Sequence, residues 1–220
     1  MKRFVLTTLI LFLLTASSWA ADDKLSIGVS LHAYYSWVKA IVGDLANVVP
    51  VIPESADPHS YQPRPEDIQR IIELDAVVIN GMGHDDYIKP MIEAAGNHNL
   101  MVIDPHKDVP LMPSHQDDFA FENDDKNQKI SYNSHTYIAI NAAVQQIYNI
   151  TKELVKRSPE HSDRFNQNAR SYAKSLRRML ADALQKINTT ASDNLRIATV
   201  HDGYAYLLSE LGIEVSAVIQ

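Results

Sequence analysis

The chain has 220 residues, of which 45% are hydrophobic and 21% are charged, and it contains no cysteine. The length suits one large domain or two smaller lobes, and the hydrophobic content is too high for a disordered chain. The lack of cysteine excludes a disulfide scaffold, an iron–sulfur site, a cysteine nucleophile and a lipidated bacterial surface anchor. A formal net charge of −7 argues against nucleic-acid binding, because neutralising phosphates requires excess lysine and arginine.

Residues 1–20 have the layout of a secretory signal peptide. Residues 1–3 carry positive charge, residues 4–14 form an apolar run of 11 residues, and small residues lead to Ala20. The apolar run is shorter than the roughly 18–20 residues needed to span a bilayer. We therefore expect cleavage after Ala20, export to a bacterial periplasm and no stable membrane insertion.

Residues 21–135 alternate apolar runs with amphipathic segments, which predicts an N-terminal α/β lobe. Parallel strands joined by helices of this length form a sheet with helices on both faces. Ligands collect at the carboxyl ends of such strands, and a histidine closely follows each predicted strand. The expected strands are 25–30, 48–52, 76–80 and 100–103, the expected helices are about 34–41, 64–74 and 86–95, and the histidines are His32, His59, His84 and His106.

The middle of the chain combines an irregular segment with two helices. Residues 105–133 are rich in Pro, Asp, Asn and Gln and predict an exposed acidic loop. A helix over 136–157 is expected to close the N-terminal lobe. A long helix follows over 158–190, with Ser158 as its N-cap and Pro159 at its first position. At roughly 40 Å it has the length of a strut between two lobes.

Residues 191–220 predict the start of a C-terminal α/β lobe. Strands are expected at 195–200 and 213–219, with a helix at 203–211 between them. A lone βαβ unit with exposed parallel edges is not a finished lobe. We therefore expect this lobe to be incomplete in the chain.

Common catalytic motifs are missing from the sequence. It has no G-x-S-x-G elbow, P-loop, G-x-G-x-x-G fingerprint or H-E-x-x-H helix. Gly81–Met82–Gly83 is interpreted as a tight turn after a strand, and Glu66 and Asp67 as capping residues in a first helical turn.

A more specific element lies at residues 57–67, which read D-P-H-S-Y-Q-P-R-P-E-D. Three prolines stiffen this loop and place His59 at its tip, as a preorganised metal site requires. An ordinary proline-rich turn whose histidine caps or packs is the alternative interpretation.

Two further histidines stand at junctions between elements. His135 lies where the acidic loop enters a helix, and His201 follows a strand of the second lobe. Taken singly, each also suits a structural role. Because the two junctions correspond, both side chains are placed to face one cleft, and neutral imidazoles suit Zn²⁺ and neighbouring transition metals. Asp202 is either an N-cap or a hydrogen-bond partner that orients His201.

Residues 57–67 resemble the D-P-H-x-Y-x-P-x-P-x-D signature of the metal receptors of bacterial ABC importers, the periplasmic zinc and manganese solute-binding proteins with the TroA-like fold. Residues 77–83 are similar to the strand and glycine turn that follow the signature in that family. Residues 201–206 resemble its H-D-x-x-x-Y element, and one long helix joining two lobes is typical of it. The resemblance covers residues 25–220.

The resemblance implies three metal ligands between the lobes: His59, His135 and His201. Histidine at the third position is similar to zinc-preferring members, so Zn²⁺ is expected ahead of Mn²⁺. The family's fourth, acidic ligand would lie beyond residue 220. Residues 133–134 are Asn-Ser where the family usually has Asp-Pro. Accessory candidates are Asp85, His84 and His115.

The function implied is that of a monomeric, non-enzymatic receptor. It would capture Zn²⁺ in the periplasm and deliver it to a membrane permease driven by a cytoplasmic ATPase. A zinc hydrolase or hydratase with a three-histidine zinc–water site is an alternative, although no local general base accompanies the histidines. A metal-dependent adhesin or a periplasmic zinc chaperone also remains open.

Overall fold

The computed structural model describes residues 24–114, 131–190 and 196–219. The predicted signal peptide and most of the predicted acidic loop, including His115, lie outside these ranges. Among the described residues, no helix combines the length and apolar character needed to cross a bilayer.

The N-terminal lobe is built on a four-stranded parallel sheet, as the sequence predicts. Its strands are β1 (Leu25–Val29), β2 (Ala46–Pro50), β3 (Ala76–Val78) and β4 (Met101–Ile103), in the order β2-β1-β3-β4. Strand β3 ends earlier than the apolar pattern suggested. The backbone N–H of Asn80 is bound by the Asp85 carboxylate and the Ser30 hydroxyl, so this part of the chain leaves the ladder.

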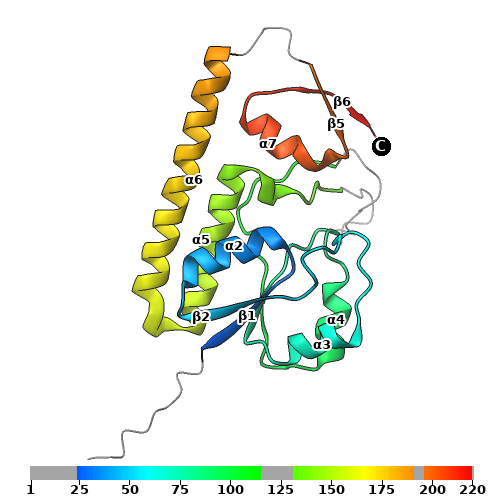
Figure 1. Ribbon diagram of the computed structural model, residues 1–220, viewed down its shortest axis with the longest axis vertical. Coiled ribbons are helices and arrows are strands. Elements are labelled where there is room, and N and C mark those ends of the chain that lie inside the picture. The colour runs from blue at the N-terminus through cyan, green and yellow to red at the C-terminus, as the bar shows by residue number, and fades with distance from the viewer. Residues whose placement is uncertain (1–23, 115–130, 191–195, 220) are drawn as a thin grey trace, which may run out of the picture.

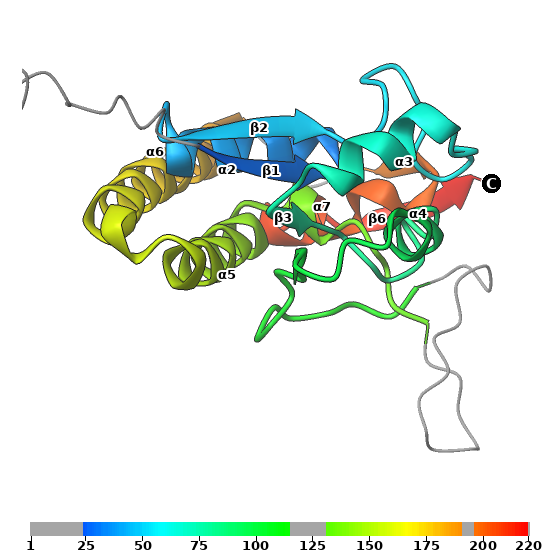
Figure 2. The ribbon, with the colours of Figure 1, turned by 90° about the horizontal axis from the view of Figure 1, so that it is seen from below.

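Helices cover both faces of this sheet, which confirms the predicted layering. Helices α2 (His32–Val42), α5 (Ile140–Arg157) and the start of α6 (Ser162–Thr190) pack on one face. Helices α3 (Pro65–Ile72) and α4 (Ile88–Ala95) pack on the other, as Figure 2 shows. Alternate residues of β3 point to opposite faces of the sheet. Val78 packs in the hydrophobic core on the first face, and Val77 packs in the core on the second.

The helix expected over 136–157 is interrupted near its start. A 3₁₀ turn spans Thr136–Ile138, Ala139 has extended backbone with φ −81° and ψ 138°, and α5 begins only at Ile140. The N-terminus of α5 has no cap from its own N-cap residue. Instead, the Glu210 carboxylate accepts the N–H groups of Ile140 and Asn141 at 2.6 and 2.7 Å.

The long helix is present, but it starts four residues later than its expected cap. A 3₁₀ turn at Pro159–His161 precedes α6, and the Ser158 side chain bonds Glu160 rather than capping the helix. Figure 1 shows α6 running along the side of the molecule from the N-terminal to the C-terminal lobe. Phe165, Ala169 and Ala173 on its first turns are fully buried.

The described part of the C-terminal lobe is one βαβ unit. Strands β5 (Ile197–Val200) and β6 (Val215–Ile219) pair in parallel, and α7 (Ala205–Glu210) follows a short 3₁₀ turn at Asp202–Tyr204. Both strands expose apolar side chains, with Val200 74% and Ile219 55% accessible. Helix α7 instead packs toward the N-terminal lobe, where Tyr206 is buried against Val109.

Candidate metal centre

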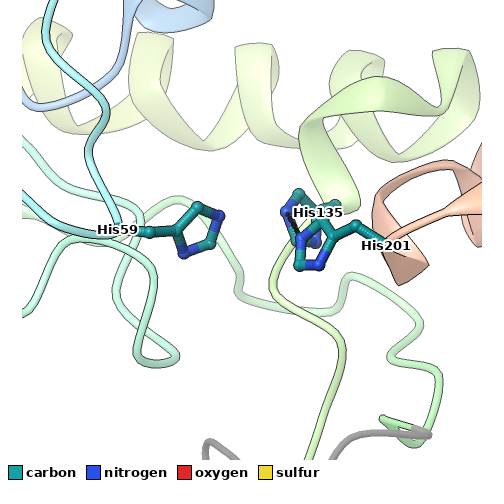
Figure 3. A group of neighbouring side chains, drawn as sticks. All are labelled: His59, His135 and His201. Carbon is teal, nitrogen blue, oxygen red and sulfur yellow. Dashed lines mark hydrogen bonds between the residues drawn. The ribbon is translucent and has the colours of Figure 1, made fainter. Parts of the chain in front are cut away.

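Three histidines from three separate segments meet between the lobes: His59, His135 and His201. One potential ligand nitrogen from each ring lies within 4.8 Å of the other two. Figure 3 shows His59 facing the other two rings from the opposite side. His135 Nε2 and His201 Nε2 are 3.1 Å apart, close to the roughly 3.3 Å between two nitrogens on a tetrahedral zinc with Zn–N bonds of about 2.0–2.1 Å. The arrangement can hold a transition-metal ion after a small closure by His59.

The loop that carries His59 is fixed at its tip by Asp57. The Asp57 carboxylate accepts the backbone N–H of His59 and the hydroxyl of Ser60, both at 3.1 Å. This local turn projects the His59 ring away from the loop. The hydrogen bond from the His59 backbone is the main factor that lowers the pKa of Asp57, so the carboxylate remains ionised and the turn intact.

The far end of the same loop is anchored by Asp67. Its buried carboxylate accepts the backbone N–H of Arg64 at 2.9 Å and the Tyr61 hydroxyl at 2.5 Å, and it pairs with Arg70 at 2.5 Å. The predicted capping role of Asp67 is therefore confirmed. The two aspartates hold the proline-rich loop at both ends, which limits the positions open to His59.

Asn133 determines which nitrogen of His135 is available. The Asn133 side-chain oxygen lies 2.9 Å from both the backbone N and the ring Nδ1 of His135. Its amide nitrogen donates to the Asp202 carbonyl at 2.6 Å, which fixes the orientation of the amide. Nδ1 of His135 must then carry the proton, and Nε2 presents its lone pair to the cluster.

His201 occupies a backbone conformation that side chains rarely adopt. Its φ of 66° and ψ of 150° fall in a region populated almost entirely by glycine. Its backbone N–H donates to the Ile219 carbonyl at 3.0 Å, which ties it to the end of the β5–β6 pair. Because His135 Nε2 is the acceptor, His201 Nε2–H is the donor in the contact between the two rings. A metal ion that takes both nitrogens displaces that proton.

Burial favours the neutral imidazoles that metal ions bind. It lowers the pKa of His135 from its ordinary 6.5 to about 4, with help from the neighbouring His201 and His59. Burial also lowers the pKa of His59, with the nearby Asp57 opposing the shift. Two of the three candidate ligands are therefore unprotonated at neutral pH.

The structure separates the accessory candidates. The His84 ring lies 4.2 Å from the His59 ring and 5.1 Å from the His135 ring, measured between centroids. Asp85 lies outside the cluster, with its carboxylate accepting the N–H groups of Asn80 and Gly81 at 2.7 Å each. It supports the turn at residues 81–83, whose three positive φ angles agree with the tight turn predicted there.

Two of the four histidines at the strand ends do not reach the cluster. His106 is bonded to Asp104 and to the Thr136 hydroxyl, at 2.9 Å each, and His32 stacks on Tyr35. Sequence reasoning also missed the positioning role of Asn133. The available signal was the position of Asn133 two residues before His135. This signal was insufficient because the hydrogen-bond partners of Asn133 lie in both lobes.

The fold and the histidine cluster together define a two-lobed fold of the solute-binding class with a candidate metal centre. The chain resembles FpvC from Pseudomonas aeruginosa in complex with Ni²⁺, at 43% identity and a TM-score of 0.77 over 90% of this chain and 67% of that one. The Mn²⁺ complex of FpvC is also 43% identical, with a TM-score of 0.78 over 89% and 68% of the two chains.

Sequence relatives indicate the same class. The high-affinity zinc uptake system protein ZnuA of Bacillus subtilis is 25% identical over 199 residues, which are 90% of this chain and 62% of that protein. Residues 27–220 match the family described as ZnuA, zinc-uptake complex component A, periplasmic. The chain belongs to this family. It spans less than two thirds of the length of this relative.

Proposed function

We propose that this chain captures a divalent transition-metal ion in the periplasm, Zn²⁺ ahead of Mn²⁺, and delivers it to an ABC-type membrane importer. The observation that carries the proposal is the cluster of His59, His135 and His201, whose ligand nitrogens lie within 4.8 Å of one another. Membership in a family described as a periplasmic zinc-uptake component supports it.

The chemistry of the ligands favours zinc over manganese. Imidazole nitrogen suits Zn²⁺, Cu²⁺, Ni²⁺ and iron, whereas Mn²⁺ prefers carboxylate and carbonyl oxygen. Within the described residues, the cluster consists of histidines alone. One FpvC structure holds Mn²⁺ and another Ni²⁺, so manganese remains a competing cargo to be measured.

The route and the partners follow from the same proposal. The predicted signal over residues 1–20 would direct export, with cleavage after Ala20, and the mature protein would act as a monomer. Its partner would be the permease of an importer, together with the ATPase that drives it. An adhesin or a zinc chaperone would use the same metal site and differ only in the partner.

A hydrolytic use of the site is less well supported. A zinc hydrolase needs a general base beside the metal-bound water. Two nearby carboxylates have other roles: Asp57 forms the His59 turn, and Asp85 supports the turn at residues 81–83. We therefore propose a receptor rather than a hydrolase.

Calorimetric titration of Zn²⁺ and Mn²⁺ into the metal-stripped chain tests the capture step. We expect one zinc ion per chain and weaker binding of manganese. No heat of zinc binding from a chain that circular dichroism shows to be folded would overturn the proposal. For delivery, deletion of the gene should reduce zinc uptake by the cell under zinc limitation; unchanged uptake would favour a chaperone or adhesin.

A further inference from the structure

His84 has a polar atom that its surroundings do not satisfy. The side chain is 2% exposed, and its Nδ1 is the only buried side-chain nitrogen or oxygen in the described part of the chain that has no hydrogen-bond partner. Buried polar groups are normally paired, so each exception calls for an explanation. A ligand that the structure does not contain is one such explanation.

The other nitrogen of the His84 ring is held in place. His84 Nε2 lies 3.0 Å from the hydroxyl of Tyr137, which belongs to the 3₁₀ turn after His135. When Nε2–H donates to this hydroxyl, Nδ1 carries a lone pair and no proton. The same logic operates at His135, where Asn133 takes the proton of one nitrogen and leaves the other available.

The neighbours of His84 are the candidate metal ligands. Its ring centroid is 4.2 Å from that of His59 and 5.1 Å from that of His135. Apart from Tyr137, these are the aromatic rings that contact it within the described residues. Four imidazoles from four segments thus gather between the lobes, and one of them has an unused nitrogen.

We propose that His84 is a fourth metal ligand, bound through Nδ1, and that the chain forms a four-histidine site with His59, His135 and His201. This inference rests on the proposed function. The three nitrogens within 4.8 Å of one another belong to the other three residues, so the rings close around the ion as it binds. His59 moves most, because His135 Nε2 and His201 Nε2 already lie 3.1 Å apart and the His59 side chain is the exposed one of the three.

A four-imidazole site has a consequence for metal choice. Four neutral imidazole ligands favour Zn²⁺, Ni²⁺ and Cu²⁺ over Mn²⁺. His84 therefore acts as a specificity residue as well as a ligand. Its removal weakens zinc binding more than manganese binding, and the preference between the two ions narrows.

X-ray absorption at the zinc edge, which counts coordinated imidazoles, tests the proposal on the full chain loaded with one equivalent of zinc. We expect four imidazoles in the unmodified protein and three in His84→Phe, which keeps an aromatic ring but has no nitrogen. The zinc affinity of His84→Phe should be at least about tenfold lower than that of the unmodified protein. The control is His32→Phe, because His32 lines the same cavity as His84 but stacks on Tyr35; it should keep four imidazoles and unchanged affinity.

Each result decides between distinct conclusions. Three imidazoles in the unmodified protein would overturn the role of His84 and leave metal capture standing. The same follows if His84→Phe has as many coordinated imidazoles as the unmodified protein. No zinc bound by the folded unmodified chain would overturn both proposals. If His84→Phe fails to fold, as judged by circular dichroism, His84→Gln takes its place, and the count in the unmodified protein still decides the matter.

Discussion

Asn133 and Asp202 belong to different lobes, yet the Asn133 amide donates a 2.6 Å hydrogen bond to the Asp202 carbonyl. The same amide group holds the His135 ring through its oxygen, and Asp202 directly follows His201. One uncharged side chain therefore joins the two segments that carry neighbouring candidate ligands. Tyr206 reinforces the link by donating to the Asn133 carbonyl and accepting the N–H of Met112.

The first prediction concerns Asn133. Asn133→Ala removes the acceptor that fixes the His135 ring, so zinc affinity should fall about 10–100-fold by calorimetry. Asn133→Asp keeps an acceptor for His135 Nδ1 but loses the donor to Asp202. It should bind zinc more tightly than Asn133→Ala while melting below the unmodified protein. Equal zinc affinities for the alanine variant and the unmodified chain would contradict the positioning role.

The second prediction concerns His59. His59→Ala should weaken zinc binding by at least about tenfold, because it removes one of the few ligands available to the ion. The His98→Ala variant is a suitable control, since His98 is exposed and outside the cluster; it should bind zinc normally. Zinc should also raise the melting temperature of the unmodified protein, with a stabilisation that grows as the logarithm of the zinc excess, and it should raise the melting temperature of His59→Ala much less. Unchanged affinity in His59→Ala would remove this residue from the site.

The third prediction concerns the contact of Glu210 with α5. The carboxylate supplies the hydrogen bonds that the helix start lacks from its own N-cap residue, and a negative charge is favourable there. Glu210→Ala should lower the free energy of unfolding by about 0.5–2 kcal/mol, the range measured for N-caps. Urea denaturation of the metal-free protein measures the change. Glu214→Ala, at an exposed position of the same lobe, should cost much less, and equal losses would refute the capping role.

The fourth prediction concerns pH. The pKa of His135 falls from its ordinary 6.5 to about 4 in the folded protein, chiefly through burial. Between these values the unfolded chain binds a proton that the folded chain does not, so stability should decline as the pH falls from 6.5 toward 4. The free energy of unfolding of the metal-free protein, measured at several pH values, should show this slope. His135→Gln should flatten it, and an identical slope in that variant would assign the effect to other groups.

Much of the architecture follows from the sequence because the relevant signals are local. Apolar runs separated by amphipathic segments predicted the strands and the two-sided helical cover, and the D-P-H loop predicted where His59 would stand. The predicted boundaries of strands and helices were wrong where groups distant in the sequence bind the backbone. Asp85 draws the backbone of Asn80 out of β3, and α5 begins at Ile140 under a carboxylate from the other lobe.

The candidate site was predicted less completely, for a related reason. His59, His135 and His201 are found together, but the contribution of Asn133 depends on partners on both sides of the cleft. In addition, the sequence around a histidine at a strand end does not indicate in which direction its side chain points. His84 turns toward His59, whereas His106 bonds Asp104 and Thr136.

His201 shows how folding stability and ion capture oppose each other at a single position. Its φ of 66° and ψ of 150° cost on the order of 1–3 kcal/mol for a residue with a side chain. Glycine would relieve that strain and lose the imidazole. The chain thus retains a locally unfavourable conformation that points the His201 ring at His135. Folding stability alone would favour glycine here, so the strained histidine indicates a requirement other than stability.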